Sequence, residues 1–182
     1  MSKSSKNGNR VAVFGTVRVL AMTAVLVAMS IVCGKYLAIR GGDILRFSFE
    51  NLPILLAGVL FGPIVGAVAG VVADLIGCVL VGYAINPVVT LGAAALGLTG
   101  GLCWHMGKSF PYWLRLALCV LSAHLVGSVL IKTLGLAAFY DMPLLVLMLW
   151  RLLNYIIVGA LEYTLLYWIL KNNAIRSIAH KS

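Results

Sequence analysis

Four ionisable side chains lie within otherwise apolar stretches of the sequence: Asp74, Lys132, Arg151 and Glu162. Burying such a group in a membrane is costly, so it usually faces a partner, a cavity or a ligand pathway. Asp74 follows Pro63 by eleven residues, which places it about 16 Å along its helix, near mid-membrane. One interpretation is that Asp74 pairs with Arg151 or Lys132 and pins a bundle of helices. The other is that these groups line a polar pocket.

The residues around Arg151 favour the pocket. Arg151 and Asn154 are one helical turn apart, and Tyr155 falls on the same stripe. Glu162 returns to nearly the same face eleven residues later, so a polar face of this helix is expected to point inward. Bases, amides and the rings of Trp150 and Tyr155 would together make a polar pocket with aromatic walls. We expect Glu162, near the other end of the helix, to reach water or to cap the helix.

Motifs for catalysis or metal binding are absent from the sequence. There is no HExxH, GxSxG or Walker A pattern, so the chain is not expected to be an enzyme. His124 is expected to hydrogen-bond a neighbouring helix rather than bind a metal. A membrane enzyme that uses Asp74, Glu162 and His124 is an alternative, but their estimated depths differ too much for one active site. The four cysteines have no ligand spacing and are expected to be small buried hydrophobic residues, with no metal site.

The elements that must position these residues are membrane spans. Of 182 residues, 62% are hydrophobic and 10% are charged, which excludes an ordinary soluble domain. A spanning helix needs roughly 20 apolar residues. The sequence therefore predicts an all-α integral membrane protein, a bundle of six transmembrane helices in the lipid bilayer. The expected helices cover residues 11–38, 52–61, 64–82, 88–106, 112–136 and 144–170.

The net charge of +9 comes mainly from basic residues that flank the apolar runs. This is the pattern of membrane topology signals, so no nucleic-acid partner is expected. Six spans place both termini on one side, and most Lys and Arg residues fall on that side, which predicts cytoplasmic termini. The chain then divides into a basic cytoplasmic tail (1–10), a transmembrane domain (11–170) and a second basic cytoplasmic tail (171–182).

The segment LRFSFENLP, residues 45–53, carries charges directly before a short apolar run. A helix from Pro53 to Phe61 would be roughly 14 Å long and could not cross a hydrocarbon core of about 30 Å. The preceding residues must fill the remaining depth, either as a kinked helix or as extended chain against a cavity. We therefore expect Arg46 and Phe47 to form a wall of the pocket, and Arg40 to lie in a solvated turn.

Small residues recur at four-residue spacing in two places. Gly58, Gly62, Gly66 and Gly70 form one series, which is typical of closely packed membrane helices. Ala24 and Ala28 repeat the spacing on the first helix. This pair has two interpretations, packing within the bundle or contact with another subunit.

Three segments resemble a known family: RFSFENLPILLAGVLFGPIVGAVAGVVADLIG, GYAINPVVTLGAAALGLTGG and WRLLNYIIVGALEYTLLYWILKN. They are similar to the substrate-binding S components of energy-coupling factor (ECF) vitamin transporters, and most of all to the folate family. The most specific feature is F-G-P-x-x-G-x-x-x-G with a following Asp. The segment after that Asp is shorter than in many folate-type members.

The resemblance implies a vitamin-capture subunit of an ECF-type ABC importer in the plasma membrane of a prokaryote. Folate or a related pterin would bind at the extracellular side. The implied partners are a transmembrane coupling subunit and two ABC-type ATPases, which would use the ATP, so no cofactor is expected on this chain. Ala24 and Ala28 match an Ala-x-x-x-Ala motif that contacts the coupling subunit. The substrate-binding candidates are Arg46, Phe47, Asp74, Asn86, Lys132, Arg151, Asn154 and Tyr155.

Two other functions are compatible with the sequence. An S component for a different water-soluble vitamin would differ only in its pocket. A self-sufficient carrier would more often show two matching halves with broken helices, and no convincing internal repeat is present.

Overall fold

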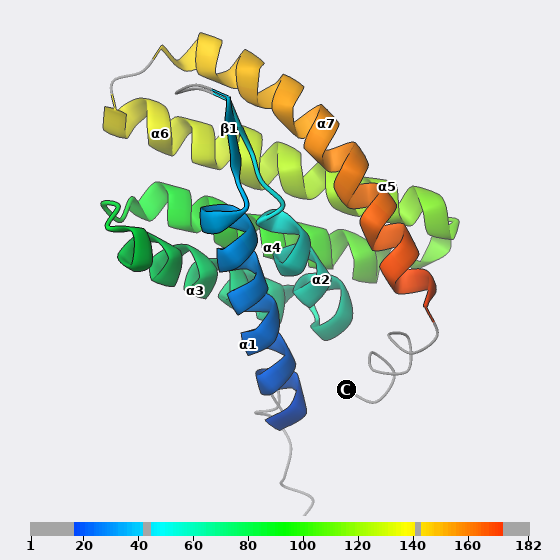
Figure 1. The fold of residues 1–182 in the computed structure, drawn as a ribbon. Helices are drawn as coiled ribbons and strands as arrows, with labels where there is room; N and C mark the ends of the chain where they lie inside the picture. Colours follow the sequence, from blue (N-terminus) through cyan, green and yellow to red (C-terminus); the bar gives the residue numbers. More distant parts are fainter. Residues whose placement is uncertain (1–16, 42–44, 141–142, 173–182) are drawn as a thin grey trace, which may run out of the picture.

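The computed structural model describes residues 17–41, 45–140 and 143–172, which form a bundle of helices with one short two-stranded ribbon (Figure 1). The elements in chain order are α1 (Val17–Ile31), η1 (Val32–Tyr36), β1 (Ile39–Gly41), β2 (Leu45–Phe47), α2 (Asn51–Phe61), α3 (Pro63–Val81), α4 (Pro87–Met106), η2 (Gly107–Ser109), α5 (Tyr112–Ala123), η3 (His124–Ile131), α6 (Lys132–Tyr140) and α7 (Leu144–Lys171). We call the end of the bundle with the β1–β2 ribbon the ribbon end. The end where α1 begins and α7 ends is the terminal end.

Five helical stretches of the described chain are long and apolar enough to cross a membrane: Val17–Tyr36, Pro63–Val81, Pro87–Ser109, Tyr112–Ala138 and Leu144–Lys171. The sixth segment, α2, has 11 residues and an apolar composition. The predicted all-α bundle with six helical segments is thus confirmed. The helix predicted over residues 112–136 runs through α5, η3 and α6 without a break and ends later, at Tyr140.

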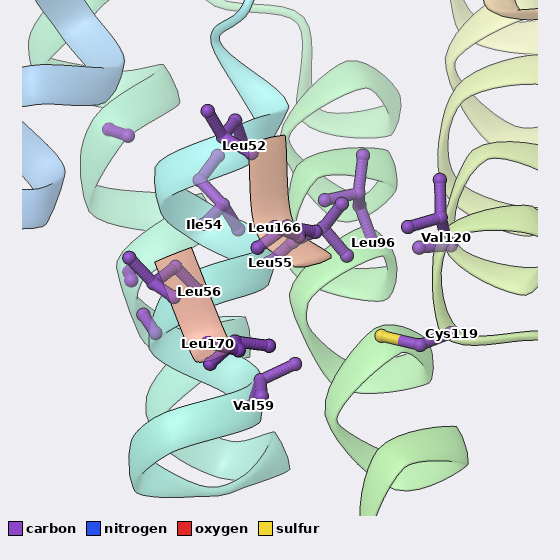
Figure 2. Close-up of a cluster of buried hydrophobic side chains, with 14 of the residues drawn as sticks. Leu52, Ile54, Leu55, Leu56, Val59, Leu96, Cys119, Val120, Leu166 and Leu170 are labelled. Carbon is purple, nitrogen blue, oxygen red and sulfur yellow. The ribbon is translucent and has the colours of Figure 1, made fainter. Parts of the chain in front are cut away.

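The short helix α2 lies at the centre of the bundle. Its residues from Asn51 to Val59 are all buried, which explains why this helix is apolar on every side. Leu55 packs there with Leu96 of α4 and Leu166 of α7, and all three are completely buried (Figure 2). A helix whose sides are packed against other helices does not need to span the bilayer, because it has little contact with lipid.

Glycines allow α2, α3 and α4 to approach one another closely. A Cβ atom on Gly97 would collide with the backbone carbonyl of Gly66, and one on Gly58 would lie 2.6 Å from the Gly97 oxygen. The small-residue series therefore packs helices together, as predicted. Gly62 differs, because its φ of 103° makes the bend between α2 and α3, a conformation that favours glycine.

The segment before α2 is extended chain, one of the two conformations expected for it. β1 and β2 pair in antiparallel fashion with Arg40 opposite Arg46, and β2 lies against α7. Arg40 was predicted in a solvated turn, but its backbone is part of strand β1 and not of a turn, while its side chain lies outside what the structure describes. The ribbon fills the depth that α2 is too short to cross.

Candidate ligand-binding site

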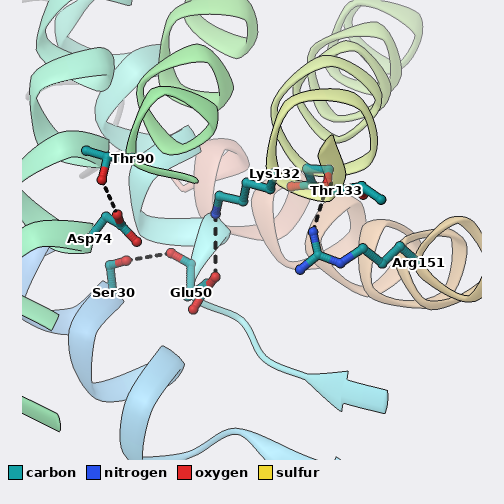
Figure 3. A network of polar contacts seen from close by, with 8 residues as sticks. Ser30, Glu50, Asp74, Thr90, Lys132, Thr133 and Arg151 are labelled. Carbon is teal, nitrogen blue, oxygen red and sulfur yellow. Dashed lines mark hydrogen bonds and ion pairs between the residues drawn. The ribbon is translucent and has the colours of Figure 1, made fainter. Parts of the chain in front are cut away.

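Asp74 lies midway along α3 and faces α4. The Thr90 hydroxyl donates a hydrogen bond of 2.7 Å to Asp74 Oδ2 (Figure 3). Neither ion pair considered for Asp74 is made among the described residues, because Lys132 and Arg151 have other partners. The interpretation of these groups as mutual pins between helices is therefore wrong for Asp74. One of its oxygens is engaged by a neutral hydroxyl, and the carboxylate is half-buried.

Lys132, the first residue of α6, pairs with Glu50, which precedes α2. The distance from Lys132 Nζ to Glu50 Oε1 is 3.6 Å, and only 5% of Lys132 is exposed. The stem of Lys132 runs over Gly92 of α4, where a Cβ atom would be 2.5 Å from Lys132 Cγ. Lysine is almost never this buried without a partner, and here the Glu50 carboxylate compensates the charge of the Lys132 ammonium.

Glu50 was not among the predicted binding residues, yet it joins three elements. Its backbone carbonyl accepts a hydrogen bond of 2.6 Å from the Ser30 hydroxyl of α1. Its carboxylate lies against Gly34 of η1, where a Cβ atom would be 2.5 Å from Glu50 Oε2. Figure 3 shows Ser30, Asp74, Glu50 and Lys132 pointing toward one another. The feature of the sequence that could have identified Glu50 is a carboxylate directly before the short apolar helix and close to the basic residue Arg46.

Arg151 of α7 is held by the π-helix η3. Its Nη1 donates a hydrogen bond of 3.2 Å to the backbone carbonyl of Ser128, and the Thr133 hydroxyl donates one of 3.3 Å to the same oxygen. Short π-helical segments often occur at functional sites. The Ser128 hydroxyl is buried and has no hydrogen-bond partner within the described chain, and the same is true of Asn51 Oδ1. These two atoms could bond to a ligand.

We use the name polar cluster for Glu50, Asp74, Thr90, Ser128, Lys132 and Arg151, and for the groups that they bond. Two bases and two carboxylates make it formally neutral. The described helices reach it from five sides, through α1, α3, α4, η3–α6 and α7. Such a cluster can bind carboxylates through its bases and hydrogen-bond donors through Asp74.

Asn86 has a structural role at the start of α4. Its Oδ1 accepts hydrogen bonds from the backbone N–H groups of Val88 and Val89, at 3.0 and 3.4 Å. Its Nδ2 donates to the carbonyl of Gly135 at 2.9 Å, which ties α4 to α6. Asn86 thus caps the helix and orders the end of the bundle where Thr90 and Asp74 meet. A contact between Asn86 and a ligand stays a prediction.

Other predicted residues are placed as follows. Asn154 is buried in the bundle and Phe47 is half-buried in β2. The backbone of Arg46 pairs in the ribbon, but its side chain is outside the part of the chain that the structure describes. Trp150 was expected in an aromatic wall, but it is 42% exposed and faces outward.

Tyr155, one helical turn after Arg151 on α7, contacts His124, and its predicted contact with a ligand stays a prediction. Its ring stacks on His124 with a centroid distance of 5.0 Å. Both residues line a groove of about 460 Å³ between α5–η3 and α7, whose other walls include Leu121, Leu152 and Ile156. The groove is almost wholly apolar, so it does not suit a charged, water-soluble ligand.

His124 and Glu162 form a buried pair between η3 and α7. His124 Nε2 and Glu162 Oε2 are 2.7 Å apart and share a hydrogen bond, and Glu162 is completely buried. The expected contact of His124 with a neighbouring helix is confirmed. The prediction that Glu162 reaches water or caps its helix is wrong, and the estimated difference in depth between these two residues is wrong as well. Asp74 is not part of this pair.

Lys35 is a further base that the sequence did not single out. Its stem packs on Gly77 of α3, where a Cβ atom would lie 2.7 Å from Lys35 Cε. Its ammonium lies 5.5 Å from the centre of the Tyr83 ring, in the connection between α3 and α4. Gly77 follows Asp74 by one helical turn, so Lys35 lies near the polar cluster at the ribbon end.

Ala24 and Ala28 are exposed on the face of α1 that points away from the bundle, whereas Thr23, Val27 and Ser30 are buried. Packing within the chain therefore does not explain this pair of small residues. Their side chains leave a smooth surface on which another helix could pack closely.

The comparisons with known proteins agree with this architecture. The family model for the ECF transporter substrate-specific component matches residues 18–170. The chain belongs to this family. Its S-component fold is also similar to the crystal structure of FolT bound with folic acid, with a TM-score of 0.69 and 26% identity. That match covers 84% of this chain and 92% of FolT.

A second solved structure, an S component for biotin from an ECF-type ABC transporter, is similar with a TM-score of 0.58 and 18% identity. The match covers 82% of this chain and 90% of the biotin protein, and at this identity it shows the fold alone. No curated protein sequence matches the chain. The resemblance stated from the sequence is confirmed, and the protein is a multi-pass membrane component of a transporter family, not of an enzyme family.

Proposed function

We propose that this S component captures folate or a related pterin, and that the ligand binds in the polar cluster. The single observation that carries the proposal is that the buried Lys132, the half-buried Arg151 and the half-buried Asp74 lie in one cluster, in a chain similar to FolT bound with folic acid. Folic acid has carboxylates at one end and a flat pterin at the other. Lys132 and Arg151 suit the carboxylates, because charge-assisted hydrogen bonds are the strong ones.

Asp74 suits the pterin end. A pterin ring carries an amino group and a ring N–H side by side, and a carboxylate can accept both. Thr90 holds one oxygen of Asp74 and thereby fixes the orientation of the carboxylate. Phe47, half-buried on β2, is a predicted aromatic side chain that could cover a flat ring. Asn154 and Arg46 stay candidates for further contacts.

Vitamin capture by this chain would be one step of an ATP-driven import. We place the ribbon end on the extracellular side and both termini in the cytoplasm of a prokaryote, because the terminal end carries most of the basic residues. The exposed Ala24–Ala28 face of α1 would dock on a transmembrane coupling subunit that works with two ABC-type ATPases. The S component would need no cofactor of its own.

The test is to purify the chain in detergent, identify the small molecules that it retains by mass spectrometry, and titrate it with folic acid and biotin. We expect folic acid to be retained and to bind with a dissociation constant below micromolar, and biotin to bind at least a hundredfold more weakly. If another vitamin is retained and folic acid does not bind, the folate assignment is wrong. If proteoliposomes that hold the chain alone accumulate the vitamin, the chain is a self-sufficient carrier.

A further inference from the structure

Glu50 occupies the position at which an acidic ligand would have to bind. It is the carboxylate that pairs with the buried Lys132 in the described chain, at 3.6 Å. We infer that Glu50 is an internal counter-ion which the ligand's carboxylate replaces on Lys132, so that Glu50 determines how strongly the site selects for ligand charge. This inference rests on the proposed function, in that it requires an acidic vitamin at the polar cluster.

Lys132 requires a negative partner in both states of the site. An ammonium this deeply buried is unfavourable without one, and Glu50 supplies it before the ligand arrives. When a ligand carboxylate approaches Lys132, two carboxylates share one ammonium, and like charges at this distance repel. The ligand then gains only the difference between its own interaction with Lys132 and the one that Glu50 gives up.

The contacts of Glu50 would confine this exchange to a side-chain rotation. Its backbone is held by the hydrogen bond from Ser30 to its carbonyl, which does not involve the carboxylate. The carboxylate lies against Gly34, and only a residue without a side chain leaves space for it there, because a Cβ atom at Gly34 would be 2.5 Å from Glu50 Oε2. Asp74 points toward the same cluster from α3, and like charges close together repel (Figure 3). Because the backbone contact with Ser30 does not depend on the carboxylate, the start of α2 can stay in place when the carboxylate leaves Lys132.

An alternative role for Glu50 is purely structural, a tie between α2, α1 and α6. The two roles predict opposite effects of Glu50→Gln, which keeps the shape and removes the charge. If Glu50 is a structural tie, Glu50→Gln weakens the contact between the helices, and every ligand binds less tightly. If Glu50 is a counter-ion, Glu50→Gln removes the carboxylate that competes for Lys132, so ligands with a carboxylate bind more tightly and the affinity for neutral ligands does not change.

The experiment measures the affinities of folic acid and of neutral 6-hydroxymethylpterin for the wild-type chain and Glu50→Gln. We expect folic acid to bind about tenfold more tightly to Glu50→Gln, the effect of one close charge interaction, and the neutral pterin to change less than twofold. Glu162→Gln is the comparison, because it makes the same substitution at a buried carboxylate that pairs with His124 and not directly with Lys132. Glu162 still interacts with Glu50 and Lys132 through space, so this variant measures the indirect effect of one lost charge and should change the affinity for folic acid clearly less than Glu50→Gln does.

Equal weakening of both ligands by Glu50→Gln, or no change in either, would overturn the inference. Failure of the folate assignment is a separate outcome, visible when wild-type protein binds neither pterin. If the vitamin then retained is another acid, such as biotin, the same tenfold gain in Glu50→Gln is expected for that acid, and its absence overturns the inference. If the retained vitamin has no carboxylate, both proposals fail.

Discussion

Replacing His124 by Leu tests the structural meaning of the pair between η3 and α7. Glu162 is completely buried and 2.7 Å from His124, so His124→Leu leaves a buried carboxyl group without this partner. Breaking a buried pair by removing one side typically costs about 3–5 kcal/mol of unfolding free energy. For a chain of this length that loss corresponds to a decrease of roughly 10 °C in Tm.

The measurement is unfolding of the purified chain in mixed detergent micelles, with thermal melting as a second probe. Glu162→Gln keeps a hydrogen-bonding group opposite His124 and should cost less than His124→Leu. The double variant His124→Leu/Glu162→Met replaces the pair by apolar groups, which is often neutral, so we expect it to recover most of the loss. Together with Glu162→Met alone, these variants complete a double-mutant cycle, which should give a coupling energy of at least about 2 kcal/mol.

Leu121→Ala is the control, because this exposed side chain on α5 should contribute less than about 0.5 kcal/mol. The reasoning fails if His124→Leu melts like the wild-type chain, or if the double variant is less stable than His124→Leu. Either result would mean that Glu162 is not held in a dry interior by His124.

Three more predictions concern packing, docking and binding. Gly97→Ala should lower the free energy of unfolding by about 1–3 kcal/mol, because the new Cβ atom would collide with the backbone of α3. In the control Gly159→Ala the new Cβ atom would lie 3.5 Å from His124 Cδ2, an ordinary contact, so the free energy of unfolding should stay within a few tenths of a kcal/mol of the wild-type value, and equal losses in both variants would contradict the close packing of α3 on α4. Ala28→Leu should leave stability and vitamin binding unchanged but reduce co-purification with the coupling subunit at least tenfold, and normal co-purification would exclude this face of α1 from the interface. Lys132→Met should weaken folic acid about thirtyfold or more in a binding titration, the loss of a buried charged contact, and an unchanged affinity would move the carboxylate site away from α6.

The polar residues show why some placements could be anticipated and others could not. Lys132 and Arg151 stood out in the sequence because bases in apolar stretches must have partners, and both are indeed turned into the bundle. Their partners were not visible, because Glu50 and Ser128 lie 82 and 23 residues away and the helix period says nothing about which helices meet. Glu162 was misplaced for the same reason, since its partner is 38 residues distant.

The sequence by itself determined the membrane environment, the number of helical segments and the need for the ribbon segment to fill the depth above α2. Hydropathy and helix length follow from local composition and a fixed rise per residue, so they require no knowledge of neighbours. Only the tertiary structure decided that Glu50 pairs with Lys132, that Thr90 bonds to Asp74 and that Tyr155 stacks on His124. Those contacts depend on the rotation and depth of each helix, which close packing at glycines such as Gly97 sets across the whole bundle.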